Sequence, residues 1–110
     1  MELTEAHLRR LQSLLAAGFA PISFPLFPAQ AAVEKYGFAA LLQPVEAGRF
    51  QLAAQPGFLI EGNLAVLVEQ GGEQWFVWKS RRVRATPKLL ADLGRFREEL
   101  ERALEIAGIV

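Results

Sequence analysis

Side chains that could perform acid–base or nucleophilic chemistry are few in this chain of 110 residues. Histidine and aspartate occur once each, as His7 and Asp92, and cysteine is absent. A serine nucleophile would have to recruit both residues from opposite ends of the chain, and no serine lies in a nucleophile-elbow sequence. His7 has no partner at a metal-ligand spacing, so we expect it to be a surface residue on the first turn of a helix. This inventory predicts a protein that is not an enzyme.

Glutamate is abundant and could supply a carboxylate pair for catalysis or for a metal ion. Glu61 and Glu69 are the most suggestive because they flank an apolar segment, and we interpret both as ends of a strand at the solvent edge. The sequence GFLIEG at residues 57–62 has the glycine spacing of a phosphate-binding loop, but it lacks the lysine and the hydroxyl residue that follow in such loops. We therefore expect no cofactor and no metal ion.

The one concentrated charge feature is the sequence KSRRVRATPK at residues 79–88. It contains five cations and no acid: Lys79, Arg81, Arg82, Arg84 and Lys88. Trp75 and Trp78 precede it, and cations beside aromatic rings are what single-stranded nucleic-acid binders use for phosphate contact and base stacking. Residues three apart on a strand face opposite sides, however, so the two rings cannot form one platform. Because glutamates at positions 98, 99, 101 and 105 could also neutralise these cations, nucleic-acid binding is an alternative hypothesis.

The most unusual stretch is FAPISFPLFP, residues 19–28, within a segment that has no charged residue between Arg10 and Glu34. It has the apolar character of a signal peptide or a membrane anchor. Its prolines recur every three or four residues and would break a spanning helix, and Glu2 and Glu5 occupy the region that is basic in a signal peptide. We therefore expect a cytoplasmic protein without a membrane span, in which residues 19–27 form an extended connector.

Capping signals predict two helices in the N-terminal part of the chain. Thr4 suits the N-cap of the first helix and Gly18 suits the residue that ends it. Its apolar face is expected to contain Leu8, Leu11 and Leu15, flanked by Leu14. A short second helix is predicted over residues 28–36, with Pro28 as its first residue and Gly37 as its end.

Strand and turn signals run from residue 38 onward. Alternation and turn residues predict strands at residues 38–45, 49–54, 58–60 and 64–70, and another from residue 73 into the basic segment. Gly71 and Gly72 can take the positive φ values of a two-residue hairpin turn, which sets Val68 opposite Trp75 and Val66 opposite Val77. Both faces of this hairpin are apolar. We therefore expect a helix layer on one face and a partner subunit on the other.

A long C-terminal helix is predicted from Thr86 as its N-cap and Pro87 as its first residue, with an end near Gly108. Its apolar stripe is expected to contain Leu89, Leu93, Phe96, Leu100, Ala103 and Ala107. The expected fold is α+β: an N-terminal helix, an apolar proline-rich connector and short helix, a four- or five-stranded antiparallel meander, and the long C-terminal helix. Residues 1–110 are expected to form a single domain.

Composition favours a protein that works through an interface. Apolar residues other than glycine make up 52% of the chain and the formal net charge is zero, so no global field attracts nucleic acid or an anionic membrane. A domain of this size has limited interior, and we expect part of the apolar excess to lie in a homodimer or other protein interface. The candidate interface residues are Phe19, Ile22, Phe24, Leu26, Phe27, Trp75 and Trp78. A carrier of a small apolar ligand, with a pocket beneath the connector, is a second alternative.

Overall fold

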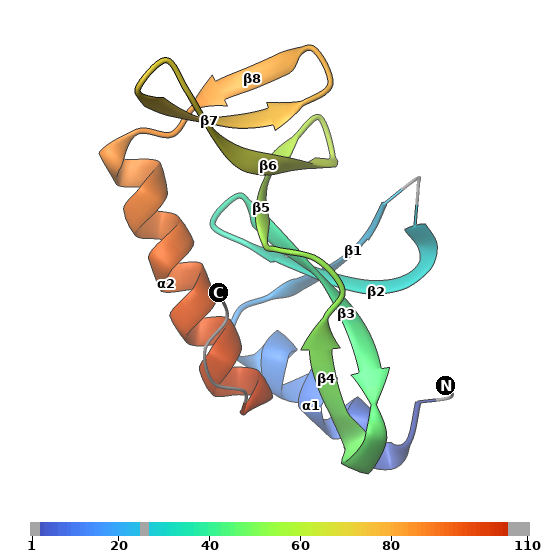
Figure 1. The fold of residues 1–110 in the computed structure, drawn as a ribbon. Helices are drawn as coiled ribbons and strands as arrows, with labels where there is room; N and C mark the ends of the chain where they lie inside the picture. The colour runs from blue at the N-terminus through green and yellow to red at the C-terminus, as the bar shows by residue number, and fades with distance from the viewer. Residues whose placement is uncertain (1–2, 25–26, 106–110) are drawn as a thin grey trace.

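The structure is a computed structural model that describes residues 3–24 and 27–105, with the backbone alone at residues 27–30. Along the chain lie α1 (Glu5–Ala16), β1 (Ala20–Phe24), β2 (Phe27–Lys35), β3 (Phe38–Val45), a single 3-10 turn η1 (Glu46–Gly48), β4 (Arg49–Leu52), β5 (Gly57–Ile60), β6 (Asn63–Gln70), β7 (Glu73–Trp78), β8 (Arg81–Arg84) and α2 (Pro87–Leu104). The predicted α+β fold, with a helix before and a helix after an antiparallel sheet, is confirmed (Figure 1). Neither described helix is long and apolar enough to cross a membrane.

The described sheet has eight strands in the order β1-β2-β3-β5-β6-β7-β8, and β4 pairs with the second half of β3. The prediction of four or five strands is therefore wrong. Three segments account for the difference. The connector forms β1, the residues expected to form a short helix form β2, and the basic segment turns at Lys79, where φ is 53°, and returns as β8.

β2 is a strand and not the predicted short helix because it pairs with a strand on each side. Its alanines and its final Glu-Lys pair have good helix propensity. Tyr36 and Gly37, however, take φ values of 58° and 83°, which close a two-residue turn into β3. Glu34 then lies opposite Ala20 of β1 and Ala39 of β3. Gly37 is therefore a turn residue and does not end a helix.

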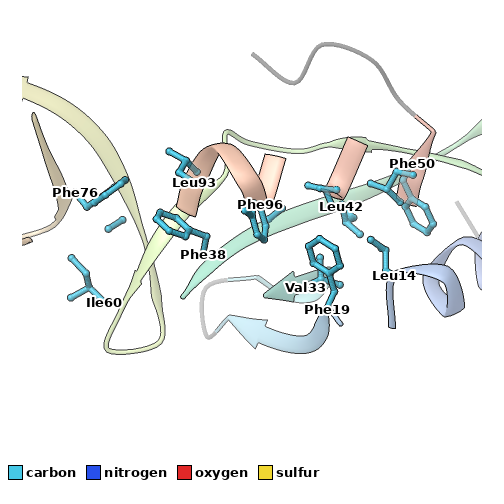
Figure 2. Close-up of a cluster of buried hydrophobic side chains, with 14 of the residues drawn as sticks. Leu14, Phe19, Val33, Phe38, Leu42, Phe50, Ile60, Phe76, Leu93 and Phe96 are labelled. Atoms are coloured by element: carbon cyan, nitrogen blue, oxygen red, sulfur yellow. The ribbon is translucent and has the colours of Figure 1, made fainter. Parts of the chain in front are cut away.

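The main core lies between the sheet and α2 (Figure 2). Phe38 of β3 is fully buried, and its ring centroid lies 5.5 Å from that of Phe76 on β7 and 6.3 Å from that of Phe96 on α2. Leu93 and Leu100 of α2 continue this layer. The apolar stripe predicted for the C-terminal helix is thus the face that packs on the sheet, as far as the described residues extend.

The C-terminal helix begins where it was predicted to begin. Thr86 is its N-cap, with its hydroxyl accepting a hydrogen bond from the backbone N–H of Leu89 at 3.2 Å, and Pro87 is its first residue. The helix ends at Leu104, and Glu105 has a left-handed φ of 56°. This end comes before the predicted one near Gly108, and residues 107 and 108 lie outside the described residues.

The sheet is also apolar on the face away from α2. Ala39 and Leu41 alternate with the core residues of β3 and point to this second face, where they form a smaller buried cluster with Phe24 and Ala32. Strand β1 contains a register irregularity between Ile22 and Phe24, and the Phe24 side chain lies in this second cluster. Strand β3 is therefore buried on both sides.

The face with which helix α1 packs is shifted from the one predicted. Its buried residues are His7 and Leu14, which was expected at the flank, and Leu11 packs against the core as expected. Two of the leucines expected on the packed face are instead exposed, Leu8 by 48% and Leu15 by 49%. His7 is only 1% exposed, so the prediction of a surface histidine is wrong. The cause is the helix cap: the Thr4 N–H donates to His7 Nδ1 at 3.0 Å, so Nε2 carries the proton and donates to the carbonyl of Val45 at 2.8 Å.

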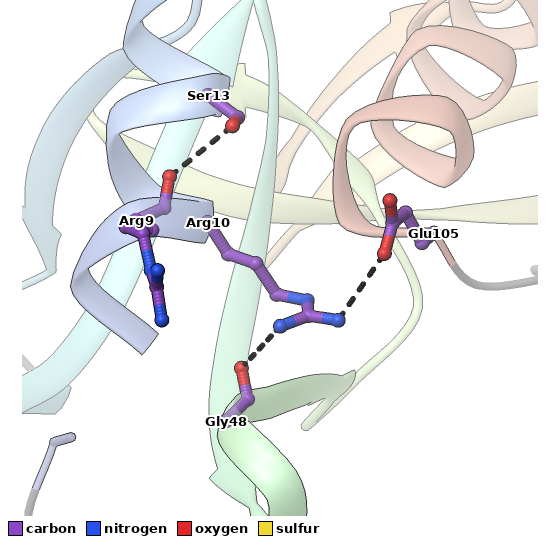
Figure 3. Close-up of polar contacts among 5 residues, drawn as sticks. All are labelled: Arg9, Arg10, Ser13, Gly48 and Glu105. Atoms are coloured by element: carbon purple, nitrogen blue, oxygen red, sulfur yellow. Dashed lines mark hydrogen bonds and ion pairs between the residues drawn. The ribbon is translucent and has the colours of Figure 1, made fainter. Parts of the chain in front are cut away.

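Arg10 joins α1 to two later elements (Figure 3). Its guanidinium donates to the carbonyl of Gly48 in η1 at 3.1 Å and to Oε2 of Glu105 after α2 at 3.2 Å. The backbone of Gly48 also lies against Ala6, because a Cβ added to Gly48 would stand 2.2 Å from the Cβ of Ala6. The start of α1 is therefore held tightly against the β3–β4 hairpin.

Candidate interaction surface

Strands β6, β7 and β8 carry apolar side chains on both faces. Leu67, Phe76 and Val83 lie on the inner face and join the main core. The opposite face, which we call the outer face, consists of Val66, Val68, Trp75, Val77, Arg82 and Arg84. The strand register sets these residues in two rows, Val66–Val77–Arg82 and Val68–Trp75–Arg84. The pairing of β6 with β7 is the one predicted from Gly71 and Gly72.

The outer face leaves much of its apolar surface open. Val66 is 52% exposed, the highest value among the exposed large apolar residues that the structure describes. Val68, Trp75 and Val77 are half-buried. Helix α2 lies on the inner side and α1 lies beside β4, away from β6–β8 (Figure 1). Neither of the two described helices covers the outer face.

Arginine side chains border this apolar surface. Arg84 forms an ion pair with Glu73, with a nitrogen–oxygen distance of 2.7 Å. The guanidinium of Arg82 lies 4.4 Å from the centroid of the Trp75 ring and donates to Oε1 of Gln70 at 3.3 Å. A cation over an indole face is attracted by the ring quadrupole. The outer face therefore combines a valine surface, an aromatic ring and a mixed-sign charged border.

The other three cations of the basic segment lie elsewhere. Arg81 is on the inner side of β8 and pairs with Glu61 at 2.7 Å. Lys79 lies in the β7–β8 turn, with its Nζ 5.3 Å from the Trp78 ring centroid, and Lys88 on α2 pairs with Asp92 at 3.4 Å. The five cations proposed as nucleic-acid contacts thus do not share one face.

The positions of the two tryptophans of β7 and the ion pairs of the C-terminal glutamates also concern the hypothesis of nucleic-acid binding. Trp75 is on the outer face and Trp78 packs against the main core, so the two rings point to opposite sides of β7, as predicted. The sequence allowed the C-terminal glutamates to neutralise the basic strand, but two of them pair elsewhere: Glu99 bonds to Lys35 and Glu105 bonds to Arg10. The ion pairs of β8 are with Glu61, in the turn before β6, and with Glu73, the first residue of β7.

The connector contributes mainly to the protein's own core. Phe19 is 3% exposed and packs edge-on against Phe96 of α2, with ring centroids 5.5 Å apart. Phe24 is 4% exposed in the second cluster, and the half-buried Ile22 packs beside it. Leu26 lies outside the described residues, and so does the side chain of Phe27. Of the candidate interface residues that are described, Trp75 is the one on the outer face.

The carboxylates singled out in the sequence mark the exposed ends of β6, as predicted. Glu61 is in the turn before β6, with a φ of 51°, and Glu69 lies opposite Gln74 near the other end. Both side chains are exposed. Among residues 3–24 and 27–105, no group of three or more histidines and carboxylates could hold a metal ion.

The side chains with shifted pKa values form a separate cluster. Lys35 donates to Glu99 and to the carbonyl of Ala17 at the end of α1, and the Tyr36 hydroxyl donates to Glu99 at 2.7 Å. The hydrogen bond to Glu99 raises the pKa of Lys35, and hydrogen bonds from Lys35 and then Tyr36 lower the pKa of Glu99. The cluster was not foreseen, since no local pattern relates residues so distant in the chain. It links α1, the β2–β3 turn and α2.

The chain matches no protein-family model, no curated protein sequence and no solved structure. Function must therefore be inferred from the surfaces of the chain itself. Among them, the outer face brings together exposed valine side chains, an aromatic ring and two arginines.

Proposed function

We propose that this protein is a non-enzymatic, cytosolic, single-domain α+β module that acts by protein–protein contact and forms a homodimer through the outer face. The observation that carries the proposal is the exposure of Val66, at 52%, on a surface continued by Val68, Trp75 and Val77. An exposed apolar surface on a sheet is costly unless a partner covers it.

A second copy of the chain suits this surface. A two-fold interface sets the same patch against itself, so the patch must be self-complementary. The valines of the outer face can pack against one another, and the border carries both signs, with Glu73 beside Arg82 and Arg84. The chain has a formal net charge of zero, so two copies have no overall repulsion. Tryptophan and arginine are also the residues most enriched among energetic hot spots of interfaces.

The dimer is tested by changing Val66 to glutamate and measuring mass by light scattering at micromolar concentration. We expect the wild-type chain to have the mass of a dimer and Val66→Glu that of a monomer, because burying an unpaired carboxylate opposes association. The matched control is Leu15→Glu. It introduces the same charge at an apolar residue of similar exposure, 49% against 52%, but on α1. Leu15→Glu should remain dimeric.

Two results would contradict this function. A wild-type chain that is monomeric at micromolar concentration removes the dimer altogether. If the wild-type chain is dimeric and Leu15→Glu dissociates it while Val66→Glu does not, the interface lies on α1 and not on the outer face. Circular dichroism of both variants should be that of the wild type, which separates dissociation from unfolding.

A further inference from the structure

Strand β8 forms the edge of the described sheet. It pairs with β7 only, and no other described strand lies on its far side (Figure 1). Its register with β7 sets Arg84 opposite Trp75. The next two residues along the ladder, Ala85 and Gln74, are joined by a hydrogen bond from the Ala85 N–H to the Gln74 carbonyl at 2.9 Å. Hydrogen-bonded and open pairs alternate along an antiparallel ladder. The backbone N–H and C=O of Arg82 therefore point away from β7.

The open edge is short and well defined. The carbonyl of Arg84 is used, because it accepts from the N–H of Thr86 at 3.0 Å. The N–H of Arg84 points outward by the same alternation as the backbone groups of Arg82. The edge thus offers two donors and one acceptor to an added strand. Peptide recognition by strand addition uses backbone groups of this kind, and side chains at alternate positions supply the selectivity.

The side chains along this edge favour an acidic occupant. Arg82 and Arg84 both project from the outer face of β8. Among the ion pairs of the described residues, Arg84 has Glu73 and Arg81 has Glu61, whereas Arg82 has the Trp75 ring and the neutral Gln70. The contacts of both arginines lie on the β7 side of β8, and Arg82 has no acidic partner among the described residues. A carboxylate on an added strand would supply one, with the Arg82 side chain turning from the Trp75 ring toward the open edge.

The same charges oppose pairing of β8 with another copy of itself. Two β8 strands side by side would bring arginines against arginines, and like charges opposite one another destabilise a sheet. Charged side chains on an edge are a common protection against indiscriminate strand pairing. The charged side chains of β8 are all positive, so they oppose pairing with basic and neutral strands more than pairing with acidic strands.

We propose that the open edge of β8 binds an extended acidic segment of a partner protein as an added antiparallel strand, with carboxylates at alternate positions facing Arg82 and Arg84. This site uses the backbone edge of β8 together with Arg82 and Arg84, which border the outer face, and not the valines of that face. A chain that does not dimerise therefore keeps the backbone edge and both arginines. In the dimer, each copy would then hold a partner at its own β8 edge, while the valines of the outer face join the two copies.

The test uses the full chain and an acetylated peptide that alternates glutamate and valine. We expect it to bind with an affinity that falls as salt rises, and to slow hydrogen exchange of the Arg82 and Arg84 amides in the NMR spectrum. A matched peptide with lysine in place of glutamate should not bind. Binding of both peptides with equal affinity, or binding without protection of these amides, would overturn the proposal.

Variants of the chain separate this site from its surroundings. Arg82→Glu should weaken peptide binding by about tenfold or more. Lys88→Glu makes the same charge change on α2, at a side chain that is 85% exposed, and should leave the affinity within about twofold of the wild type. Equal losses in the two variants would show a general charge effect and contradict a specific edge site.

Two further measurements distinguish the competing explanations. The monomeric Val66→Glu chain should still bind the acidic peptide, so loss of the dimer and loss of the edge site are separate outcomes. A single-stranded oligonucleotide is tested on the same amides. If it protects them and the acidic peptide does not, the edge serves nucleic acid and the proposed partner is wrong.

Discussion

His7 has a hydrogen-bond partner at each ring nitrogen, and this arrangement links the start of α1 to the end of β3. Nδ1 accepts from the N–H of Thr4, and Nε2 donates to the carbonyl of Val45. The ring also packs edge-on against Phe50, with centroids 5.1 Å apart. A glutamate or glutamine usually fills this position of a capping box. Histidine here adds a second bond, from Nε2 to the carbonyl of Val45, which an ionised glutamate could not make because it has no donor.

Replacement of His7 should measure this link. We expect His7→Ala to lower the free energy of unfolding by about 2–3 kcal/mol, because it removes both hydrogen bonds and leaves a cavity beside Phe50. His7→Gln retains a side-chain acceptor for Thr4 and should lose only about 1 kcal/mol. Urea denaturation followed by circular dichroism gives both values. Wild-type stability of His7→Ala would show that the ring is not buried in solution.

Gly48 is a second residue whose identity is imposed by its surroundings. It has a φ of 68°, and an added Cβ would stand 2.2 Å from the Cβ of Ala6. Gly48→Ala should therefore lower the free energy of unfolding by about 3 kcal/mol, from a left-handed backbone and a steric clash together.

A matched glycine separates the two contributions at Gly48. Gly62 has a φ of 77° and nothing within 4 Å of an added Cβ, so Gly62→Ala should lose only the backbone part, about 1 kcal/mol. The double change Ala6→Gly with Gly48→Ala removes the clash, and we expect it to be more stable than Gly48→Ala alone. Thermal or urea unfolding checks all three. Equal losses for Gly48→Ala and Gly62→Ala would mean that α1 does not press on η1.

At the scale of elements, a boundary could be predicted where the residues that determine it lie at the boundary itself. The Thr86-Pro87 pair specifies the start of α2 by itself, and Gly71-Gly72 specifies the β6–β7 turn. Strand β2 has no such signal, because its composition suits a helix and its pairing depends on β1 and β3. The face of α1 was mispredicted for a similar reason. Leucine spacing favoured one side, whereas the bond from His7 to Val45 fixes the other.

The outer face could be predicted in part. The alternation of β6 and β7 was enough to place Trp75 beside Val68 and to separate it from Trp78. The stacking of Arg82 on Trp75 could not be predicted, since it requires the chain to reverse at Lys79 and Ser80. Neither is glycine, asparagine or aspartate, the residues that usually mark such a turn. A continuous basic strand was therefore expected where the structure has a hairpin.

At the scale of the whole molecule, α2 connects two regions with different roles. Its first half packs beneath β6–β8, and its last turns lie near α1 (Figure 1). The outer face and the β8 edge belong to the first region. The Arg10 and Lys35 contacts belong to the second, where they join α1 to α2. Changes in the second region should alter stability while leaving association and peptide binding in place.

The ion pair between Lys35 and Glu99 gives this second region a defined pH dependence. The folded pKa of Glu99 is lowered from its ordinary value of 4.5, so its contribution is present above pH 4.5 and is lost as pH falls through the lowered pKa. The folded pKa of Lys35 is raised from 10.5, so its contribution is complete below pH 10.5 and is lost as pH rises through the raised pKa.

Glu99→Gln tests this dependence because it removes one charge and keeps the shape. We expect the wild-type chain to be more stable than Glu99→Gln across the neutral range, and the difference to shrink at both extremes, below pH 4.5 and above pH 10.5. Urea denaturation at a series of pH values measures it. Glu98→Gln, the same change at an exposed neighbour on α2, should show no such window. A difference between wild type and Glu99→Gln that stays constant from acid to alkaline pH would mean that the charges of Lys35 and Glu99 do not stabilise the junction of α1 with α2.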